Sequence, residues 1–354
     1  MAKITKFAAM KLYNQIDSKI LKEQLKDDGV LRLTISFYKY VGIKNAAFFR
    51  DYLYYHFSSI DVRGRIYVAH EGINAQISIP KSNLSQFLEI CNNINFLKNI
   101  RLNFAREDNG KSFFKLKVLV RDKIVADGID DATFDASNTG KYLKAKEFNE
   151  IIEREDVTLI DMRNHYESEI GHFKNAWLPD VDTFRESLPK ITASLKTRKD
   201  KPVVMYCTGG IRCEKASAYM KHNGFEEVYH LEGGIIEYAR QIEAENLTNK
   251  FLGKNFVFDE RLGETIGNEV IAQCHQCGSP CDTHTNCANE ACHLLFIQCE
   301  SCKSLLNNCC STVCNEINAL PIDEQRALRK GKKSRRNIFK KGRGTLPFMK
   351  KNQG

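Results

Sequence analysis

The cysteine at position 207 is the side chain of this sequence best placed to act as a nucleophile. It follows the apolar run Val203–Tyr206, and two glycines, Gly209 and Gly210, come before a helical pattern begins. A strand, a tight turn and a helix in that order place the thiol at a helix N-terminus, where backbone N–H groups and the helix dipole favour an anion. Arg212 adds a positive charge. Because the thiolate is the reactive form of cysteine, the pattern predicts a nucleophilic Cys207.

The loop after Cys207 is short enough for its amides to surround an anionic group while Arg212 holds that group by charge. We expect the active-site loop to consist of Thr208, Gly209, Gly210 and Ile211. The cysteine-to-arginine spacing is one residue shorter than tyrosine-phosphatase chemistry uses, which argues against that activity. A persulfide needs a similar ring of amides, so a sulfurtransferase stays open. Cys213 is either a resolving thiol or, as we favour, a small buried helix residue.

The cysteines of this chain are concentrated near its C-terminal end, where ten of the 13 lie between Cys274 and Cys314. In a reducing compartment this density indicates metal ligation rather than disulfides. Zinc-ribbon spacing predicts one structural zinc site and leaves ligands for a second, interleaved one. The first set is Cys274, Cys277, Cys299 and Cys302, and the second is Cys287, Cys292, Cys310 and Cys314. Four further residues stay open as substitutes: Cys281, Cys309, His284 and His293.

Residues 1–126 show the order of elements of a ferredoxin-like, or acylphosphatase-like, α+β domain. Alternating apolar and polar residues predict strands, and apolar faces with helical spacing predict two helices. The expected strands are Leu31–Tyr38, Arg65–Val68, Ala75–Ile79, Arg101–Phe104 and Phe114–Val120, and the expected helices are residues 45–57 and 81–97. The order is β-α-β-β-α-β with one additional strand.

Residues 145–248, which follow a polar linker over residues 127–144, predict a central, doubly wound α/β domain. The strands Val157–Ile160 and Pro202–Tyr206 are continuous apolar runs, as in a parallel sheet covered on both faces. The expected helices are residues 145–154, 183–195, 213–223 and 235–246. Ligands of such domains bind at the carboxyl ends of the strands, and Cys207 lies at one of them.

The positive net charge of +9 comes from the end of the chain. Beyond the cysteine-rich module of residues 268–316, we expect a basic tail over residues 317–354. Residues 326–354 hold 12 of the 53 Lys and Arg residues and no acidic ones, so the remaining 41 face 44 acidic residues. This pattern favours binding to nucleic-acid phosphates over a plain solubility tail. The sequence has no membrane-spanning run and no secretory signal, which predicts a cytoplasmic protein without membrane contact.

The central segment resembles a rhodanese domain through three motifs in the expected order. The first runs from Asp161 to Asn164 and continues through Glu167 to Gly171–Phe173, the second is Cys207–Arg212, and the third is Leu231–Ile235. Three further stretches resemble the rhodanese-domain tRNA uridine hydroxylases: Gly64–Ala75, Phe256–Arg261 and Cys274–Gly278. The resemblance therefore covers nearly the whole chain apart from its ends.

The resemblance implies an oxygen-dependent hydroxylation of the wobble uridine of tRNA to 5-hydroxyuridine. It implies that Cys207 is the catalytic residue, that O2 is a cosubstrate, and that the anticodon loop of tRNA is the partner. It implies no organic cofactor, and no obligate protein partner is evident. It also favours a His70–Asn74 loop that reaches toward tRNA or toward the rhodanese site, whereas the residues alone predict a hairpin turn.

Residues near the end of the first rhodanese strand are expected to support the site rather than to touch substrate. We expect Asp161 and Arg163 to lie near Cys207, with Arg163 paired to Glu167 so that it holds its loop. These three are the supporting residues of the predicted site.

The chemistry can be written as a hypothesis in which the Cys207 thiolate adds to C6 of uracil and leaves an enolate that oxygen attacks at C5. Arg212 and the loop amides would stabilise charge on O4. A persulfide or sulfenate on Cys207 is the alternative reactive species. Two other functions stay open, a sulfurtransferase and a non-catalytic tRNA-binding module. The second is disfavoured because the cysteine, the arginine and the loop glycines are all present.

Overall fold

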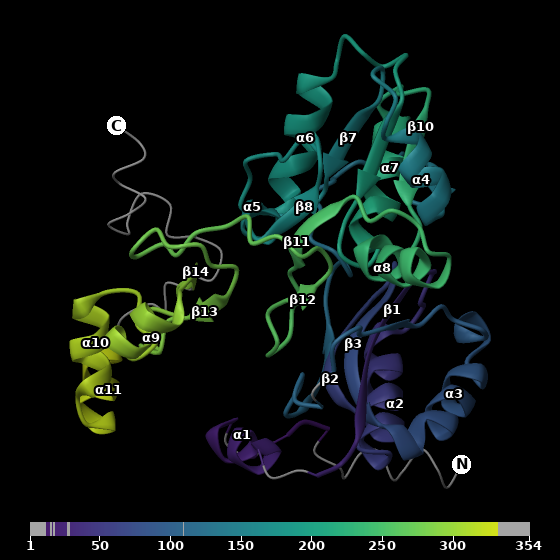
Figure 1. Cartoon of the computed structure of the whole chain (residues 1–354). Helices are drawn as coiled ribbons and strands as arrows, with labels where there is room; N and C mark the ends of the chain where they lie inside the picture. The colour runs from purple at the N-terminus through teal and green to yellow at the C-terminus, as the bar shows by residue number, and fades with distance from the viewer. Residues whose placement is uncertain (1–11, 15, 17, 27–28, 109, 332–354) are drawn as a thin grey trace, which may run out of the picture. The chain divides into compact units, whose positions relative to one another are not determined.

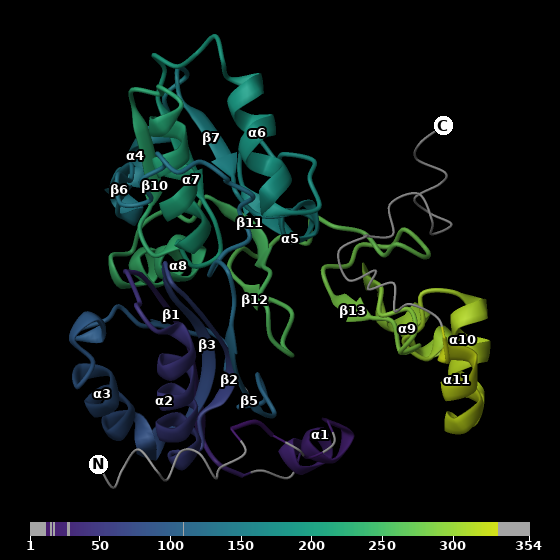
Figure 2. The same cartoon turned by 180° about the vertical axis from the view of Figure 1, so that it is seen from behind.

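The computed structural model describes residues 12–331 apart from 15, 17, 27, 28 and 109. Residues 332–354 of the predicted basic tail therefore lie outside the described residues. The chain divides into two compact units, seen from opposite sides in Figures 1 and 2. The first comprises Met1–Val157, Thr197–Leu247 and Phe258–Arg261, and the second comprises Thr158–Lys196, Thr248–Val257 and Leu262–Gly354.

The N-terminal part of the first unit is a five-stranded sheet of order β4-β1-β3-β2-β5. The strands are β1 (Arg32–Tyr40), β2 (Arg63–Ala69), β3 (Gly72–Pro80), β4 (Asn103–Phe104) and β5 (Leu116–Val120). The first four pair antiparallel, and β5 adds to β2 in parallel. This confirms the predicted ferredoxin-like order with one additional strand. A short helix, α1 (Ser18–Lys26), precedes the sheet.

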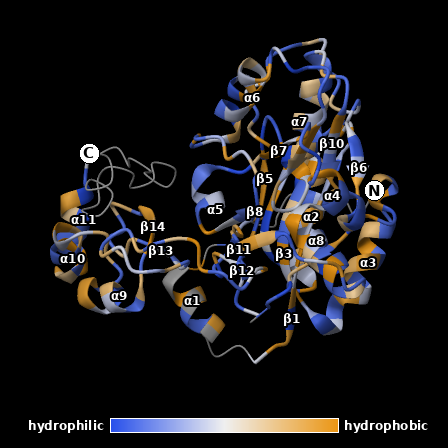
Figure 3. Cartoon of the chain, turned by 45° about the horizontal axis from the view of Figure 1, so that its top comes forward, coloured by the Kyte–Doolittle hydropathy of each residue, from blue (hydrophilic) through white to orange (hydrophobic). Residues whose placement is uncertain are grey.

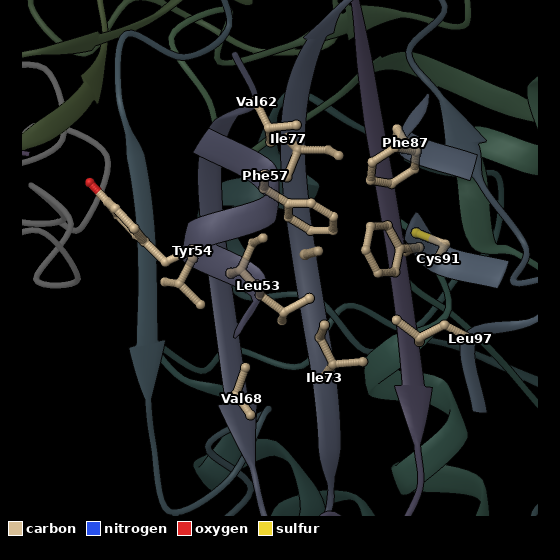
Figure 4. Close-up of a cluster of buried hydrophobic side chains, with 14 of the residues drawn as sticks. Leu53, Tyr54, Phe57, Val62, Val68, Ile73, Ile77, Phe87, Cys91 and Leu97 are labelled. Carbon is tan, nitrogen blue, oxygen red and sulfur yellow. The ribbon is translucent and has the colours of Figure 1, made fainter. Parts of the chain in front are cut away.

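Helices α2 (Ala46–Ser59) and α3 (Leu84–Asn92) supply the core of this part together with the sheet. Figure 4 shows the side chains that meet there, among them Phe57 of α2 and Phe87 of α3, whose ring centroids lie 5.3 Å apart. Cys91 is buried in the same cluster, and burial raises its pKa to about 12. Close packing in an apolar core of this kind gives the N-terminal sheet and its two helices a defined arrangement.

The helix predicted over residues 81–97 is wrong in extent. The segment consists of the 3-10 turn η2 (Lys81–Asn83), helix α3 and the 3-10 turn η3 (Asn95–Leu97). Ile94 adopts an extended conformation, with φ −104° and ψ 110°. The asparagines around it have low helix propensity, so the apolar spacing continues where the hydrogen-bonded helix does not.

The rhodanese-like part of the first unit contains three parallel strands in the order β6-β10-β9. These are β6 (Lys141–Leu143), β10 (Val228–Leu231) and β9 (Val203–Tyr206), with helices α4 (Ala145–Ile151), α7 (Ile211–His222) and α8 (Gly234–Ala244). All four residues of β9 are buried, as the continuous apolar run predicts for a parallel sheet covered on both faces. The central doubly wound α/β fold is therefore confirmed.

The second unit begins with β7 (Thr158–Asp161), α5 (His165–Glu169), β8 (Gly171–Phe173) and α6 (Phe184–Ser194). A three-stranded sheet of order β12-β11-β8 follows, built with β11 (Phe251–Asn255) and β12 (Glu264–Thr265). The cysteine-rich module has a hairpin of β13 (His284–Asn286) and β14 (Leu295–Ile297), followed by α9 (Glu300–Leu306), α10 (Thr312–Ala319) and α11 (Ile322–Arg329).

The helices carry both hydrophobic and hydrophilic residues, as amphipathic helices that pack on a core do (Figure 3). Among residues 12–331 as described, no helix has the length and apolar character that crossing a bilayer requires.

Candidate active site

Cys207 lies in the turn between strand β9 and helix α7, as predicted. The backbone N–H of Gly210 donates to the Cys207 Sγ over 3.2 Å. Gly210 has φ +94°, and a Cβ there would stand 3.0 Å from the Tyr38 hydroxyl oxygen, so the turn requires glycine. The cysteine side chain has no exposed surface. Its surroundings are nevertheless polar, because amides, a hydroxyl and a guanidinium all lie at this loop.

The electrostatics of the loop favour a thiolate. Burial alone raises the pKa of Cys207, but a hydrogen bond from Cys213, the charge of Arg212 and backbone N–H groups at both positions outweigh it and lower the pKa to about 6. At neutral pH most of this sulfur is therefore ionised. Cys213 is buried and donates to the thiolate, so it does more than fill space in the helix.

We expect a thiolate-dependent rate to be flat above about pH 7 and to fall about tenfold per pH unit below pH 6. The sign follows from the lowered pKa, since protonation below about 6 removes the nucleophile. The measurement is kcat/KM against pH, together with the ultraviolet thiolate absorbance of the wild type minus that of Cys207→Ser. The Arg212→Gln variant should titrate at a higher pH. A wild-type titration near the ordinary thiol value would contradict the assignment.

The Leu231–Ile235 motif holds the cysteine loop through backbone hydrogen bonds. At the start of α8, the N–H groups of Ile235 and Ile236 donate to the carbonyls of Cys207 and Thr208 over 3.0 and 3.2 Å. A Cβ at Gly234 would lie 2.5 Å from the Cys207 carbonyl oxygen, so only glycine allows this approach. These two hydrogen bonds occupy the Cys207 and Thr208 carbonyls at the start of α8, and the Gly210 amide donates to the sulfur.

Arg212 connects the loop to an aromatic ring that the sequence analysis did not assign to the site. Its guanidinium donates to the Thr208 hydroxyl over 3.3 Å and lies 5.7 Å from the ring centroid of Phe258. Phe258 is 39% exposed. Arg261 holds this segment by donating to Asp259 over 2.6 Å and to the Glu107 carbonyl over 2.6 Å. The motif that ends at Arg261 thus places an exposed ring beside the loop arginine.

Two tyrosines of β1 contact the first turn of α7. The Tyr38 hydroxyl donates to Glu214 over 3.1 Å, and the Tyr40 hydroxyl donates to the Ile211 carbonyl over 3.2 Å. Burial raises the pKa of both tyrosines well above the ordinary value, so both are neutral donors. The ferredoxin-like part of the chain therefore packs directly against the segment that carries the cysteine loop.

The His70–Asn74 segment reaches helix α7, which follows the cysteine loop; this is the interpretation that the family resemblance favoured. Glu71 accepts a hydrogen bond from Lys215 of α7 over 2.6 Å, and Asp127 also pairs with Lys215. The Lys215 side chain is 2% exposed and Asp127 is fully covered. The sequence placed Asp127 in a linker, so this buried ion cluster was not predicted.

The predicted supporting residues form a network within the second unit. Arg163 pairs with Asp161 over 2.7 Å and donates to the Gly171 carbonyl over 2.6 Å. Glu167, the partner expected for Arg163, accepts the backbone N–H of Asn164 over 3.0 Å at the start of α5. The bidentate Asp161–Arg163 pair and the helix cap together fix the segment that follows β7.

Both predicted cysteine sets come together in the cysteine-rich module. In each set the sulfur atoms lie within 4.8 Å of one another: Cys274, Cys277, Cys299 and Cys302, and Cys287, Cys292, Cys310 and Cys314. Individual Sγ–Sγ distances are 3.6 and 3.7 Å. A tetrahedron with metal–sulfur bonds of about 2.3 Å has edges of about 3.8 Å, so each group could hold a metal ion. The open substitutes Cys281, Cys309, His284 and His293 belong to neither group.

Comparison with known proteins decides the family. A tRNA uridine(34) hydroxylase of Salmonella typhimurium strain LT2 is 57% identical over 336 residues, covering 95% of this chain and 96% of that protein. One of Enterobacter sp. strain 638 is 55% identical over the same shares. The chain belongs to the tRNA uridine(34) hydroxylase family.

Family models match three stretches of this family member. They describe a UPF0176 acylphosphatase-like domain over residues 32–124, a rhodanese-like domain over 144–241 and a rhodanase C-terminal region over 252–315. A solution NMR structure of a rhodanese-like domain from Anabaena sp. is 18% identical with a TM-score of 0.25, and covers 32% of this chain and 78% of its own. The predicted multidomain architecture, ferredoxin-like then rhodanese-like then cysteine-rich, is confirmed.

Proposed function

We propose that this protein hydroxylates C5 of the wobble uridine of tRNA to give 5-hydroxyuridine, with O2 as cosubstrate. The observation that carries the proposal is the family membership over 95% of the chain, combined with a thiolate-forming cysteine in the rhodanese loop. In this proposal the loop supplies what addition to a pyrimidine needs. Cys207 is the ionised nucleophile, and the loop donors stabilise the negative charge that develops on the base.

Each group of the loop has a part in the proposed reaction. The Cys207 thiolate adds to C6, and the electron pair moves to O4, where Arg212 and the amides of Thr208, Gly209, Gly210 and Ile211 stabilise it. The resulting enolate carbon C5 takes one oxygen atom from O2, and loss of the C5 proton then expels the Cys207 thiolate from C6 and restores the C5–C6 double bond. The overall change replaces C5–H by C5–OH and yields water, so it consumes two electrons and two protons from an external reductant. Mass spectrometry of trapped enzyme separates a C6 adduct from a persulfide or sulfenate on Cys207.

The experiment is nucleoside mass spectrometry of tRNA from cells that lack this gene, with and without complementation by the wild-type gene. Loss of 5-hydroxyuridine on deletion and its return on complementation support the proposal. Growth under isotopically labelled O2 should place the label in the new hydroxyl group. A deletion strain with undiminished 5-hydroxyuridine contradicts the proposal.

A sulfurtransferase is the second candidate, and the Gly210 N–H at 3.2 Å from the sulfur favours it, because the same ring of amides suits a persulfide. It predicts loss of a thiolated nucleoside in the same deletion strain and no effect on 5-hydroxyuridine. The two outcomes appear in one chromatogram and exclude one another.

We propose that the two cysteine groups hold structural zinc, because four thiolates at these spacings leave no open coordination position. Protein purified without chelator should contain two zinc ions per chain. Cys277→Ser should lose about one of them, whereas Cys91→Ser, in the apolar core of the N-terminal part, should lose none. Metal analysis of the purified proteins gives the numbers. Less than one zinc per wild-type chain would count against this assignment.

We propose further that the anticodon loop is the part of tRNA that enters the site and that the basic tail, residues 317–354, binds tRNA phosphates. A tRNA substrate and reduced cysteines support a cytoplasmic protein. The domain limits that we propose are 1–126, 127–144 for the linker, 145–248, 268–316 and 317–354. The family models over residues 32–124 and 144–241 support the limits of the first and central domains.

A further inference from the structure

Asn103 is a buried amide whose oxygen has no hydrogen-bond partner within the described structure. It begins β4 at the edge of the N-terminal sheet, where it pairs with Ser36 of β1. The residue is 3% exposed, and its Oδ1 is among the buried side-chain atoms without a partner. A buried polar atom without a partner destabilises the folded state relative to a paired one, so its retention calls for an explanation.

The amide faces the cysteine loop. A Cβ built on Gly209, two residues beyond Cys207, would stand 3.8 Å from the Asn103 Nδ2. Neighbouring contacts hold the same edge of the sheet against the rhodanese-like part, since Arg101 pairs with Glu232 over 2.6 Å. The Tyr38 hydroxyl lies at Gly210 in the same loop. Asn103 thus lies beside the cysteine loop at Gly209, while its own oxygen accepts no hydrogen bond within the described structure.

An asparagine amide matches one edge of uracil in hydrogen-bonding character. It offers an acceptor and a donor side by side in one plane. Uracil presents N3–H as a donor and O4 as an acceptor, also side by side. The groups available at Asn103 are therefore complementary to the base that Cys207 is proposed to attack.

We propose that Asn103 binds and orients the target uracil, with Oδ1 accepting from N3–H and Nδ2 donating to O4. The inference rests on the proposed function and deepens it by naming the residue that recognises the uracil base through hydrogen bonds. The donor to O4 also stabilises the charge that thiolate addition creates there, so Asn103 contributes to kcat as well as to binding. Because Asn103 and Cys207 are both covered in the described structure, the base reaches them only when this sheet edge moves off the loop.

The first test measures binding without oxygen, so that no turnover occurs. The probes are anticodon stem-loops that carry either uridine or 3-methyluridine at the wobble position, since the methyl group removes the N3–H donor. Wild-type protein should bind the uridine probe about tenfold more tightly than the 3-methyluridine probe. A factor of this size is what one good buried hydrogen bond contributes to affinity. Asn103→Leu should bind the two probes equally. Equal binding of both probes by the wild type overturns the inference.

The second test measures activity and stability of the same variants. Asn103→Leu should lower kcat for 5-hydroxyuridine about 10²-fold or more, while its thermal midpoint stays equal or rises because an unpaired polar group is gone. Asn103→Asp, which cannot donate to O4, should be at least as impaired. Asn93→Leu, at an exposed asparagine beyond α3, is the matched control and should be unchanged.

The two tests separate failure of the inference from failure of the proposed function. If the wild type distinguishes the two probes but makes no 5-hydroxyuridine, the base-binding role of Asn103 is supported and the proposed hydroxylase activity is refuted. If the wild type hydroxylates and Asn103→Leu retains its rate within threefold, the role of Asn103 is refuted and the hydroxylase activity is supported.

Discussion

Replacing Cys207 with serine is expected to lower the rate of 5-hydroxyuridine formation by at least about 10³-fold. Serine is nearly isosteric, so the loop amides and the carbonyl bonds to α8 remain in place. Its hydroxyl, however, stays protonated at neutral pH, whereas the pKa of Cys207 is about 6. The variant thus removes the nucleophile and leaves the structure intact.

The measurement is single-turnover conversion of a purified tRNA substrate, followed by nucleoside mass spectrometry. Cys91→Ala serves as the control, because it removes a buried thiol from the core of the N-terminal part without touching the loop. That variant should lose some stability and keep its rate. If Cys207→Ser forms 5-hydroxyuridine at the wild-type rate, the hypothesis of catalysis by the Cys207 thiolate is wrong.

Replacing Lys215 with methionine is expected to destabilise the first unit by about 3–5 kcal/mol. The change keeps the length of the side chain but leaves Asp127 and Glu71 without their shared cation. Asp127 is fully covered, so its carboxylate would then be charged and poorly compensated. The same pair connects the His70–Asn74 loop to α7, so the rate of the enzyme should fall as well.

Urea unfolding at neutral pH measures this loss, and the pH dependence has a definite sign. Burial raises the pKa of Asp127, but hydrogen bonds from Lys123 and Lys215 outweigh it, and the pKa is lowered. The stability that the ionised Asp127 carboxylate contributes is therefore fully present above the pKa of this group in the unfolded chain. It is lost as the pH falls through the pKa of the group in the folded protein. Lys215→Met should show less of this dependence than the wild type.

Lys221→Met on the same helix is the matched control, since the Lys221 ammonium donates to two neutral groups, the Asn138 side chain and the Thr139 carbonyl. It should cost less than about 1 kcal/mol. A loss below this value for Lys215→Met would mean that the cluster does not stabilise the fold. Adding Glu71→Gln and Asp127→Asn to Lys215→Met should recover part of the loss, because no fully buried charge is then left unpaired; Lys123, which also pairs with Asp127, is 35% exposed.

The sequence was most informative where function depends on residues that are close together along the chain. The strand, glycine turn and helix around Cys207 are contiguous, and both cysteine sets follow from spacing, so the structure brings together the residues that were predicted. The long strand β1 of the N-terminal sheet also follows from alternation of apolar and polar residues. Local patterns carry these features because local geometry produces them.

Contacts between distant segments were not predictable in the same way. Tyr38 meets Glu214 across 176 positions, and Glu71 meets Lys215 across 144. No periodicity marks such pairs, and Asp127 looks like any polar linker residue until the fold buries it. Short elements were also missed, because a strand of three residues such as β8 is too brief to show alternation.

The order in which the two cysteine groups occur along the chain has a consequence for how the module assembles. The first group closes a loop from Cys277 to Cys299, and that loop contains Cys287 and Cys292, half of the second group. An ion bound by either group would therefore shorten the free chain that the other group must close, which would lower the entropic cost of the second binding event. With both groups loaded, the two sites would depend on one another, so that losing the ion from one site would weaken binding at the other.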